Sequence, residues 1–177
     1  MSPGSKATGE RGACGPEVIA LLRMRTPVKV VVGIAVVGLA IQLVRFEQTN
    51  PPVESDIHAP ADVDQLLRRA CYDCHSHETK WPWYSQVAPV SWLVTRDTNE
   101  GRKHLNFSRW GSYSLERQQK KLKEIAEEVG EGEMPMAIYL PMHPEAKFSA
   151  AEKERLVNWA KTSTPTTPSS PEPAHAE

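Results

Sequence analysis

The sequence predicts an all-α fold for the larger, C-terminal part of the chain, preceded by one long apolar segment. Apolar residues recur in that part at intervals of three and four, the spacing of one face of an α-helix. No stretch alternates apolar and polar residues as a half-buried strand does. With 177 residues, the chain suits one domain with flanking segments. A net charge of −1 gives no reason to expect nucleic acid as a partner.

The N-terminal region predicts a membrane anchor. Residues 1–27 are polar and glycine-rich, and we expect them to be disordered. The 19 residues of segment 28–46 are uncharged except for Lys29 and Arg45, and a bilayer core needs about 20 residues of helix. A cleaved signal peptide would show small residues at a cleavage site, and a buried core helix would have a polar face. Neither feature is apparent, so we expect an uncleaved transmembrane signal anchor.

The distribution of charge predicts the orientation of this anchor and the domain boundaries. Five Lys and Arg residues lie at or before Lys29, whereas none occurs between Phe46 and Leu67. The positive-inside rule therefore places the N-terminus in the cytoplasm and the rest of the chain outside the membrane. We expect a proline-containing linker at 47–60, a folded domain at 61–161 and a disordered, proline-rich tail at 162–177.

Three amphipathic helices are expected in the folded domain. The first starts at Asp62, with Gln65 completing a capping box, and its apolar face runs to Cys74. The second spans 115–129 and ends at Gly130 and Gly132. The third starts at Ser149, with Glu152 three residues on, and runs to about residue 161. The stretch 81–110 contains four of the five tryptophans and has weak periodicity, so we expect loops with a short helix near 91–98.

Cys71, Cys74 and His75 form a C-x-x-C-H sequence, the attachment motif of a c-type haem. Residues three and four apart lie on the same side of a helix. Two thiols can therefore reach the vinyl groups of the porphyrin while the imidazole reaches the iron. The motif predicts one covalently bound haem c with His75 as an iron ligand.

Three other interpretations of the cysteine pair remain open. A thioredoxin-like redox pair would follow a strand, which is not predicted here. A zinc site would need two further ligands at short spacing, and only His77 is close. A plain disulfide would leave His75 unexplained. Cys14 stands apart from the pair, in the polar N-terminal segment.

Met134 is the expected second axial ligand of the iron. It lies in a Gly-Glu-Met-Pro sequence directly after a predicted helix, and the following proline favours a loop. It is 59 residues beyond His75, which leaves enough chain to reach the other face of the haem. The alternatives are Met136, Met142, His77, His104 and His143.

Outer contacts of the haem can also be proposed from residue types. A metal-bound histidine usually donates its other N–H to a carbonyl, and Pro82 and Pro89 are the nearest candidates for it. Lys120, Lys121 and Lys123 form either a docking surface or a solvated helix face that nearby glutamates neutralise. Candidate donors to the haem propionates are Arg102, Trp81, Trp83, Tyr84 and His104.

The chain resembles a family of small, membrane-anchored bacterial haem-binding domain proteins. The matching stretches are Asn50–Pro52, Cys71–Val94, Glu100–Trp110, Gly132–Pro135 and Tyr139–Ser149. The resemblance covers about 46–161. It implies a class I cytochrome c-like domain behind an N-terminal anchor, which places the haem domain in the periplasm and the anchor, as a single pass, in the bacterial inner membrane.

Methionine and histidine ligands together would leave no open position on the iron and would raise its reduction potential. We therefore expect single-electron transfer, with no enzymatic activity. The alternatives are a haem-based ligand sensor, in which Met134 dissociates, and a haem-bearing subunit of a respiratory complex. The sequence does not identify the redox partner.

Overall fold

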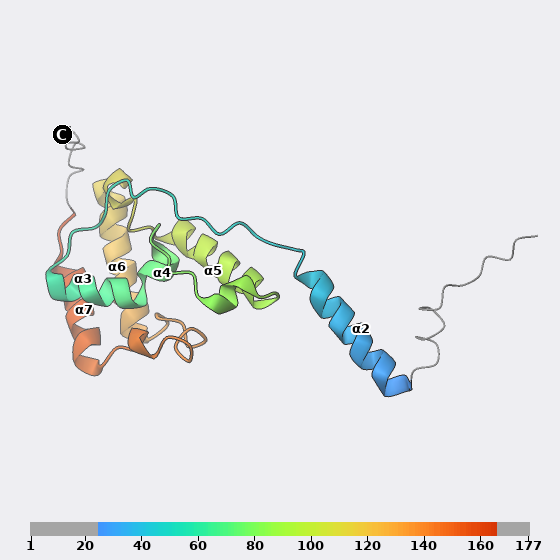
Figure 1. Ribbon diagram of the computed structural model, residues 1–177. Coiled ribbons are helices and arrows are strands. Elements are labelled where there is room, and N and C mark those ends of the chain that lie inside the picture. Colours follow the sequence, from blue (N-terminus) through green and yellow to red (C-terminus); the bar gives the residue numbers. More distant parts are fainter. Residues whose placement is uncertain (1–24, 166–177) are drawn as a thin grey trace, which may run out of the picture. The chain divides into compact units, whose positions relative to one another are not determined.

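The computed structural model describes residues 25–165 (Figure 1). It contains two compact units, Met1–Val44 and Arg45–Glu177. Cys14 and most of the segments 1–27 and 162–177, for which we expect disorder, lie outside the described residues.

The first unit contains helix α2 (Thr26–Ile41). Its 16 residues include none that is buried, and a proline occupies the first turn. The helix ends before the expected segment 28–46 does, with Gln42 as its C-terminal cap. The side-chain amide of Gln42 donates to the carbonyl of Gly38. Within residues 25–165, no helix is both long and apolar enough to cross a membrane.

The second unit is all-helical, as expected. Its helices are α3 (Ala61–Ala70), α4 (Tyr72–His75), α5 (Val90–His104), α6 (Leu115–Glu131) and α7 (Ala150–Thr162), with 3-10 turns η1 (Trp83–Gln86), η2 (Trp110–Ser112) and η3 (Pro144–Ala146). Helix α6 packs along α7, and α3 contacts α7 and α4 (Figure 1). Leu67, Phe107, Leu122 and Leu156 are fully buried between them. Among the described residues, the only strand-like pairing is one isolated bridge between Ser55 and Arg109.

The two C-terminal helices begin and end as their sequences predict. Ser114 caps α6 by accepting a hydrogen bond from the backbone N–H of Arg117. Gly132 ends α6 in the left-handed conformation, with φ of 87°, whereas Gly130 stays inside the helix. Ser149 and Glu152 form the expected capping box at the start of α7.

Helices α3 and α5 differ from the expectation. Helix α3 begins after Pro60 without a side-chain cap, so the Asp62 capping box is wrong. The backbone breaks at Cys71, with φ of −122°, before α4 resumes. Helix α5 is 15 residues long, whereas we expected only a short helix near 91–98. Its buried residues are Thr95 and Thr98, which gave no apolar period to detect.

The segment expected to be a free linker is bound to the second unit. Its chain is extended, but the backbone N–H groups of Glu54 and Ser55 both donate to the carbonyl of Ser108. Ile57 joins the hydrophobic core. We call residues 48–57 the strap, because its hydrogen bonds hold it against the domain along its length. The folded unit thus begins near Arg45 rather than Pro60.

Candidate functional site

A cavity of about 630 Å³ lies between α4, α5, α6 and the loop that follows α6. This volume is in the range of pockets that hold cofactors and other small molecules. Apolar side chains form much of its wall, and they include Leu105, Phe107, Ile125 and Val129. All four residues predicted to hold the haem line this cavity: Cys71, Cys74, His75 and Met134.

Cys71 and Cys74 are free thiols, with no disulfide between them. The backbone N–H groups of Cys74 and His75 both donate to the carbonyl of Cys71, so the motif forms one helical turn despite the break at Cys71. Burial, reinforced by the neighbouring Cys74, raises the pKa of Cys71 to about 12. Burial and then the carboxylates of Asp73 and Asp97 raise the pKa of Cys74 to about 11. Both sulfurs are therefore neutral, which does not suit a reactive redox thiolate.

The imidazole of His75 is held on one side by two backbone carbonyls. Its Nδ1 lies 3.0 Å from the oxygen of Gly101 and 3.1 Å from the oxygen of Leu105. The expected carbonyl partners, Pro82 and Pro89, are thus wrong, since the end of α5 supplies both acceptors. Burial lowers the pKa of His75. With Nδ1 as the donor, a neutral ring presents Nε2 as a ligand atom.

Gly101 brings α5 against the motif. A Cβ atom at this position would lie 2.5 Å from the carbonyl oxygen of Cys74, which is closer than any real contact. Thr98, one turn earlier, forms a hydrogen bond with the thiol of Cys74. The absence of a side chain at Gly101 therefore permits the approach that places its carbonyl beside His75.

Two methionines of the loop that follows α6, Met134 and Met136, line the cavity. Met134 is half-buried, packs against the hydrophobic core and donates its backbone N–H to Glu128. Met136 also lines the cavity, whereas Met142 does not and is exposed. The cavity is thus consistent with Met134, and it keeps Met136 as the alternative.

Two of the alternative histidine ligands have other partners. The Nδ2 of Asn106 lies 2.8 Å from Nε2 of His77, and Nδ1 of His77 lies 2.9 Å from the carbonyl of Pro52. Because the amide donates to Nε2, Nδ1 carries the proton and donates to the strap. The side chain of His143 contacts Tyr84 and Glu145. His104 is exposed at the edge of the cavity.

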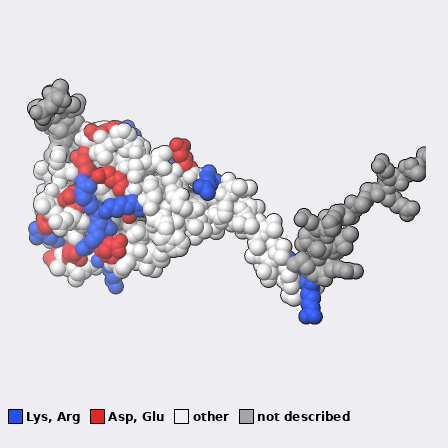
Figure 2. Space-filling view, viewed as in Figure 1, with Lys and Arg blue, Asp and Glu red and all other residues white. Residues whose placement is uncertain are grey.

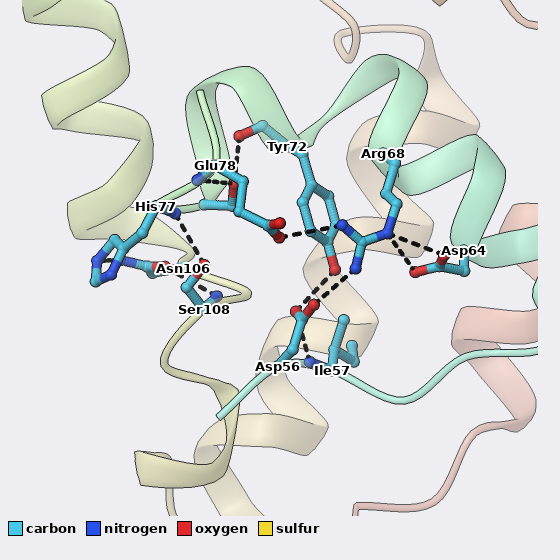
Figure 3. A network of polar contacts seen from close by, with 10 residues as sticks. Asp56, Ile57, Asp64, Arg68, Tyr72, His77, Glu78, Asn106 and Ser108 are labelled. Carbon is cyan, nitrogen blue, oxygen red and sulfur yellow. Dashed lines mark hydrogen bonds and ion pairs between the residues drawn. The ribbon is translucent and has the colours of Figure 1, made fainter. Parts of the chain in front are cut away.

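A polar network around Tyr72 holds the C-x-x-C-H motif in place (Figure 3). The hydroxyl of Tyr72, which lies between the two cysteines, donates to Asp56 of the strap. Arg68 lies over the Tyr72 ring and pairs with Asp56, Asp64 and Glu78. In the same figure, the backbone N–H of His77 donates to Ser108. These contacts hold both ends of the C-x-x-C-H turn in place.

The rim of the cavity carries different donors from most of those expected. Arg102 does not line the cavity, because its guanidinium donates to Ser76 and Thr79 and to the strap at Thr49 and Asn50. Trp83 is exposed, and neither it nor Trp81 or Tyr84 lines the cavity. The nitrogen donors that line the cavity are instead Lys120 and Lys121, together with the expected His104. Lys121 is shielded from solvent and pairs with Glu124 at 2.5 Å.

Tyr139 is a cavity residue that sequence reasoning missed. Its hydroxyl donates to Asp73, at 2.8 Å, and its ring stacks on His143 with the centroids 4.0 Å apart. Burial, followed by the hydrogen bond to Asp73, raises the pKa of Tyr139. This contact ties the loop after α6 to the motif and so closes one side of the cavity. Only its place near the Met-Pro sequence could have suggested it.

The model of the haem-binding domain family matches residues 36–162, which is most of the chain. The chain belongs to this family. In this haem-binding domain the match begins in α2 and ends at the last residue of α7. No curated protein and no solved structure matches the chain.

The residues of this haem-binding domain fit the cofactor. Two unbridged thiols, a neutral imidazole with a free Nε2 and a thioether border one largely apolar cavity. Within residues 25–165, no group of three or more His, Cys, Asp and Glu side chains is placed to hold a metal ion.

Proposed function

We propose that this haem-binding domain is a c-type cytochrome that holds one haem covalently through Cys71 and Cys74. The observation that carries the proposal is that both thiols and His75 border the same cavity, with the thiols unbridged. Thioethers are uncharged, so they suit a site where burial opposes thiolates. Attachment at the two sulfurs also holds the cofactor during any local opening of the domain.

His75 and Met134 are the proposed axial ligands. The carbonyls of Gly101 and Leu105 fix the ring and the tautomer of His75, which raises the basicity of its Nε2. Met134 comes from the loop that Tyr139 and Asp73 hold against the motif. Lys120, Lys121 and His104 are the proposed donors to the propionates, because they line the rim of the cavity.

The proposed role is single-electron transfer, which is the chemistry that the haem supplies when it is bound. The apolar part of the cavity wall would shield the haem, and His75 and Met134 would hold its iron. We therefore propose no enzymatic activity. The redox partner is a second protein that the cavity does not identify.

We also propose that the chain is anchored in the bacterial inner membrane by the apolar segment 28–46, with the haem domain in the periplasm. The support is the charge asymmetry of the sequence and the exposure of most large apolar side chains of α2, which are Val28, Val30, Val31, Ile34, Val36, Val37 and Leu39. Helix α2 (Thr26–Ile41) covers residues 28–41 of this segment. A bilayer would extend the helix, because backbone groups in lipid must be paired.

One experiment tests the electron-transfer proposal. The purified full chain, assembled in cells that attach haem c, is titrated potentiometrically and then exposed to carbon monoxide in the reduced state. We expect a one-electron transition and no carbon monoxide adduct. Rapid formation of an adduct would instead favour the ligand sensor, and the absence of any redox transition would contradict both roles.

A further inference from the structure

An uncharged, partly exposed segment of the haem domain lies outside the site described above. The 15 residues from Trp81 to Thr95 include no Asp, Glu, Lys or Arg. They form η1 and the first turns of α5. Four of their large apolar side chains are exposed: Trp83 (74%), Val87 (45%), Val90 (43%) and Leu93 (42%). Contiguous apolar surface of this kind marks an interaction site more often than scattered apolar residues do.

We group these four side chains with Phe46 and call the set the apolar face: Phe46, Trp83, Val87, Val90 and Leu93. Phe46 is 56% exposed, and its ring meets that of Trp92 edge-on, with the centroids 6.4 Å apart. Val90 and Leu93 are three residues apart and so share one side of α5. Figure 2 shows a surface without charged residues over η1 and the start of α5, beside the strongly charged part of the domain.

Hydrogen bonds fix the apolar face in shape. The side-chain amide of Gln48 in the strap donates to the carbonyl of Ser85 in η1, at 2.6 Å, and to the hydroxyl of Thr95 in α5, at 3.2 Å. The polar groups beneath the face are thus paired within the domain. The exposed side chains of the apolar face are therefore held in one arrangement by the folded domain.

The chain itself points to what covers this face. Phe46 follows Val44, the last residue of the first unit, by two positions. Between Ile41, where α2 ends, and Gln48, the first hydrogen-bonded residue of the strap, lie only six residues. Six extended residues span at most about 20 Å. An anchored α2 would therefore keep the face close to the lipid surface.

The residues that border the face suit a bilayer surface. Arg45, Lys80 and Arg96 are exposed and directly precede or follow the segment 81–95 and Phe46 in the sequence, with Glu47 and Asp97 as the neighbouring acids. Basic residues beside an apolar surface attract anionic headgroups. Tryptophan at the headgroup level is typical of proteins in contact with membranes, because one end of its ring system is apolar and the other can donate a hydrogen bond.

We propose that the apolar face rests on the headgroup layer of the bilayer in which the chain is anchored. This inference depends on the membrane anchor proposed above. With this contact, the haem domain lies on the membrane surface. The short tether and the lipid contact then limit the directions from which a redox partner can approach the cavity.

Photolabelling tests the proposal on the full haem-loaded chain. The chain is reconstituted in vesicles of phosphatidylethanolamine and phosphatidylglycerol that contain a phospholipid with a diazirine near its headgroup. After illumination, the labelled peptides are mapped by mass spectrometry. We expect label on residues 28–44 and also on residues 81–94.

Substitution of Trp83→Gln together with Leu93→Gln should reduce the label on 81–94 several-fold and leave that on 28–44 unchanged. Leu115→Gln, at an exposed apolar residue of α6, is the matched control and should change neither. The haem spectrum and Tm of each variant show whether its fold is kept.

The outcomes separate the two proposals. Label on 28–44 but not on 81–94 would overturn the lipid contact and keep the anchor. Label on neither would overturn both. Cross-links that join residues 81–94 of two chains, without lipid label there, would show that a second copy covers the face and would also overturn the proposal.

Discussion

His75 and Gly101 are joined by a 3.0 Å contact between the imidazole Nδ1 and the backbone carbonyl oxygen. Gly101 can supply this oxygen because its missing side chain lets α5 approach the carbonyl of Cys74. One glycine thus sets both the packing of α5 on the motif and the orientation of the proposed iron ligand.

Gly101→Ala should destabilise the domain. The new methyl group would meet a backbone carbonyl that cannot rotate away, so we expect a loss of about 1–3 kcal/mol in the free energy of unfolding. The fraction of chains that carry haem should fall with it. Denaturant unfolding and haem absorbance measure the two effects.

The matched control is Gly130→Ala in α6, where the nearest atom to the new Cβ is 3.9 Å away. Alanine is favoured over glycine inside a helix by about 0.5–1 kcal/mol, so this variant should be more stable than the natural chain. Equal behaviour of the two variants would refute the role of the close approach at Gly101.

Met134→Ala tests the second axial ligand. Loss of the thioether should convert the oxidised haem to a high-spin form, lower its reduction potential and allow carbon monoxide to bind after reduction. Met136→Ala is the control from the same loop and should keep the low-spin spectrum. The reverse pattern would move the ligand to Met136.

His77→Phe tests whether His77 is structural. The variant leaves the buried side-chain amide of Asn106 without its acceptor, which should cost about 1–3 kcal/mol of stability. The haem spectrum should not change, because His77 is engaged by Asn106 and Pro52. His58→Phe, at an exposed position, should alter stability little. A spectral change in His77→Phe alone would show that His77 contributes to the haem site.

Acid should weaken the start of α7. Hydrogen bonds from the backbone N–H of Ser149, from Arg69 and from the Ser149 hydroxyl lower the pKa of Glu152 from 4.5 to about 2. A lowered folded-state pKa contributes stability above pH 4.5 that is lost as the pH falls toward about 2. The Tm difference between the natural chain and Glu152→Gln should therefore shrink over this range. A difference that stays constant with pH would show that the ionised carboxylate does not stabilise the helix.

The parts of the fold that sequence predicts are those with local chemical markers. Gly132 marks the end of α6 and the Ser149–Glu152 pair marks the start of α7, and each works through its own neighbours. The C-x-x-C-H motif is equally local, and its three named residues do line one cavity.

The parts that sequence misses depend on contacts between distant segments. Helix α5 buries Thr95 and Thr98 against the strap and the motif, so its inner face has no apolar period. The partners of His75 are backbone carbonyls, which no residue type reveals. The strap is extended and contains two prolines, like a linker, and what distinguishes it is its contacts with distant residues such as Arg102, His77 and Ser108.

The mass of the denatured full chain, purified from cells that attach haem c, tests the covalent site most directly. We expect the polypeptide mass plus one haem, and the bare polypeptide mass when both Cys71→Ala and Cys74→Ala are present. A natural chain that keeps no haem after denaturation, and weighs two hydrogens less than its reduced form, would show that the two sulfurs are joined to each other and would contradict the account.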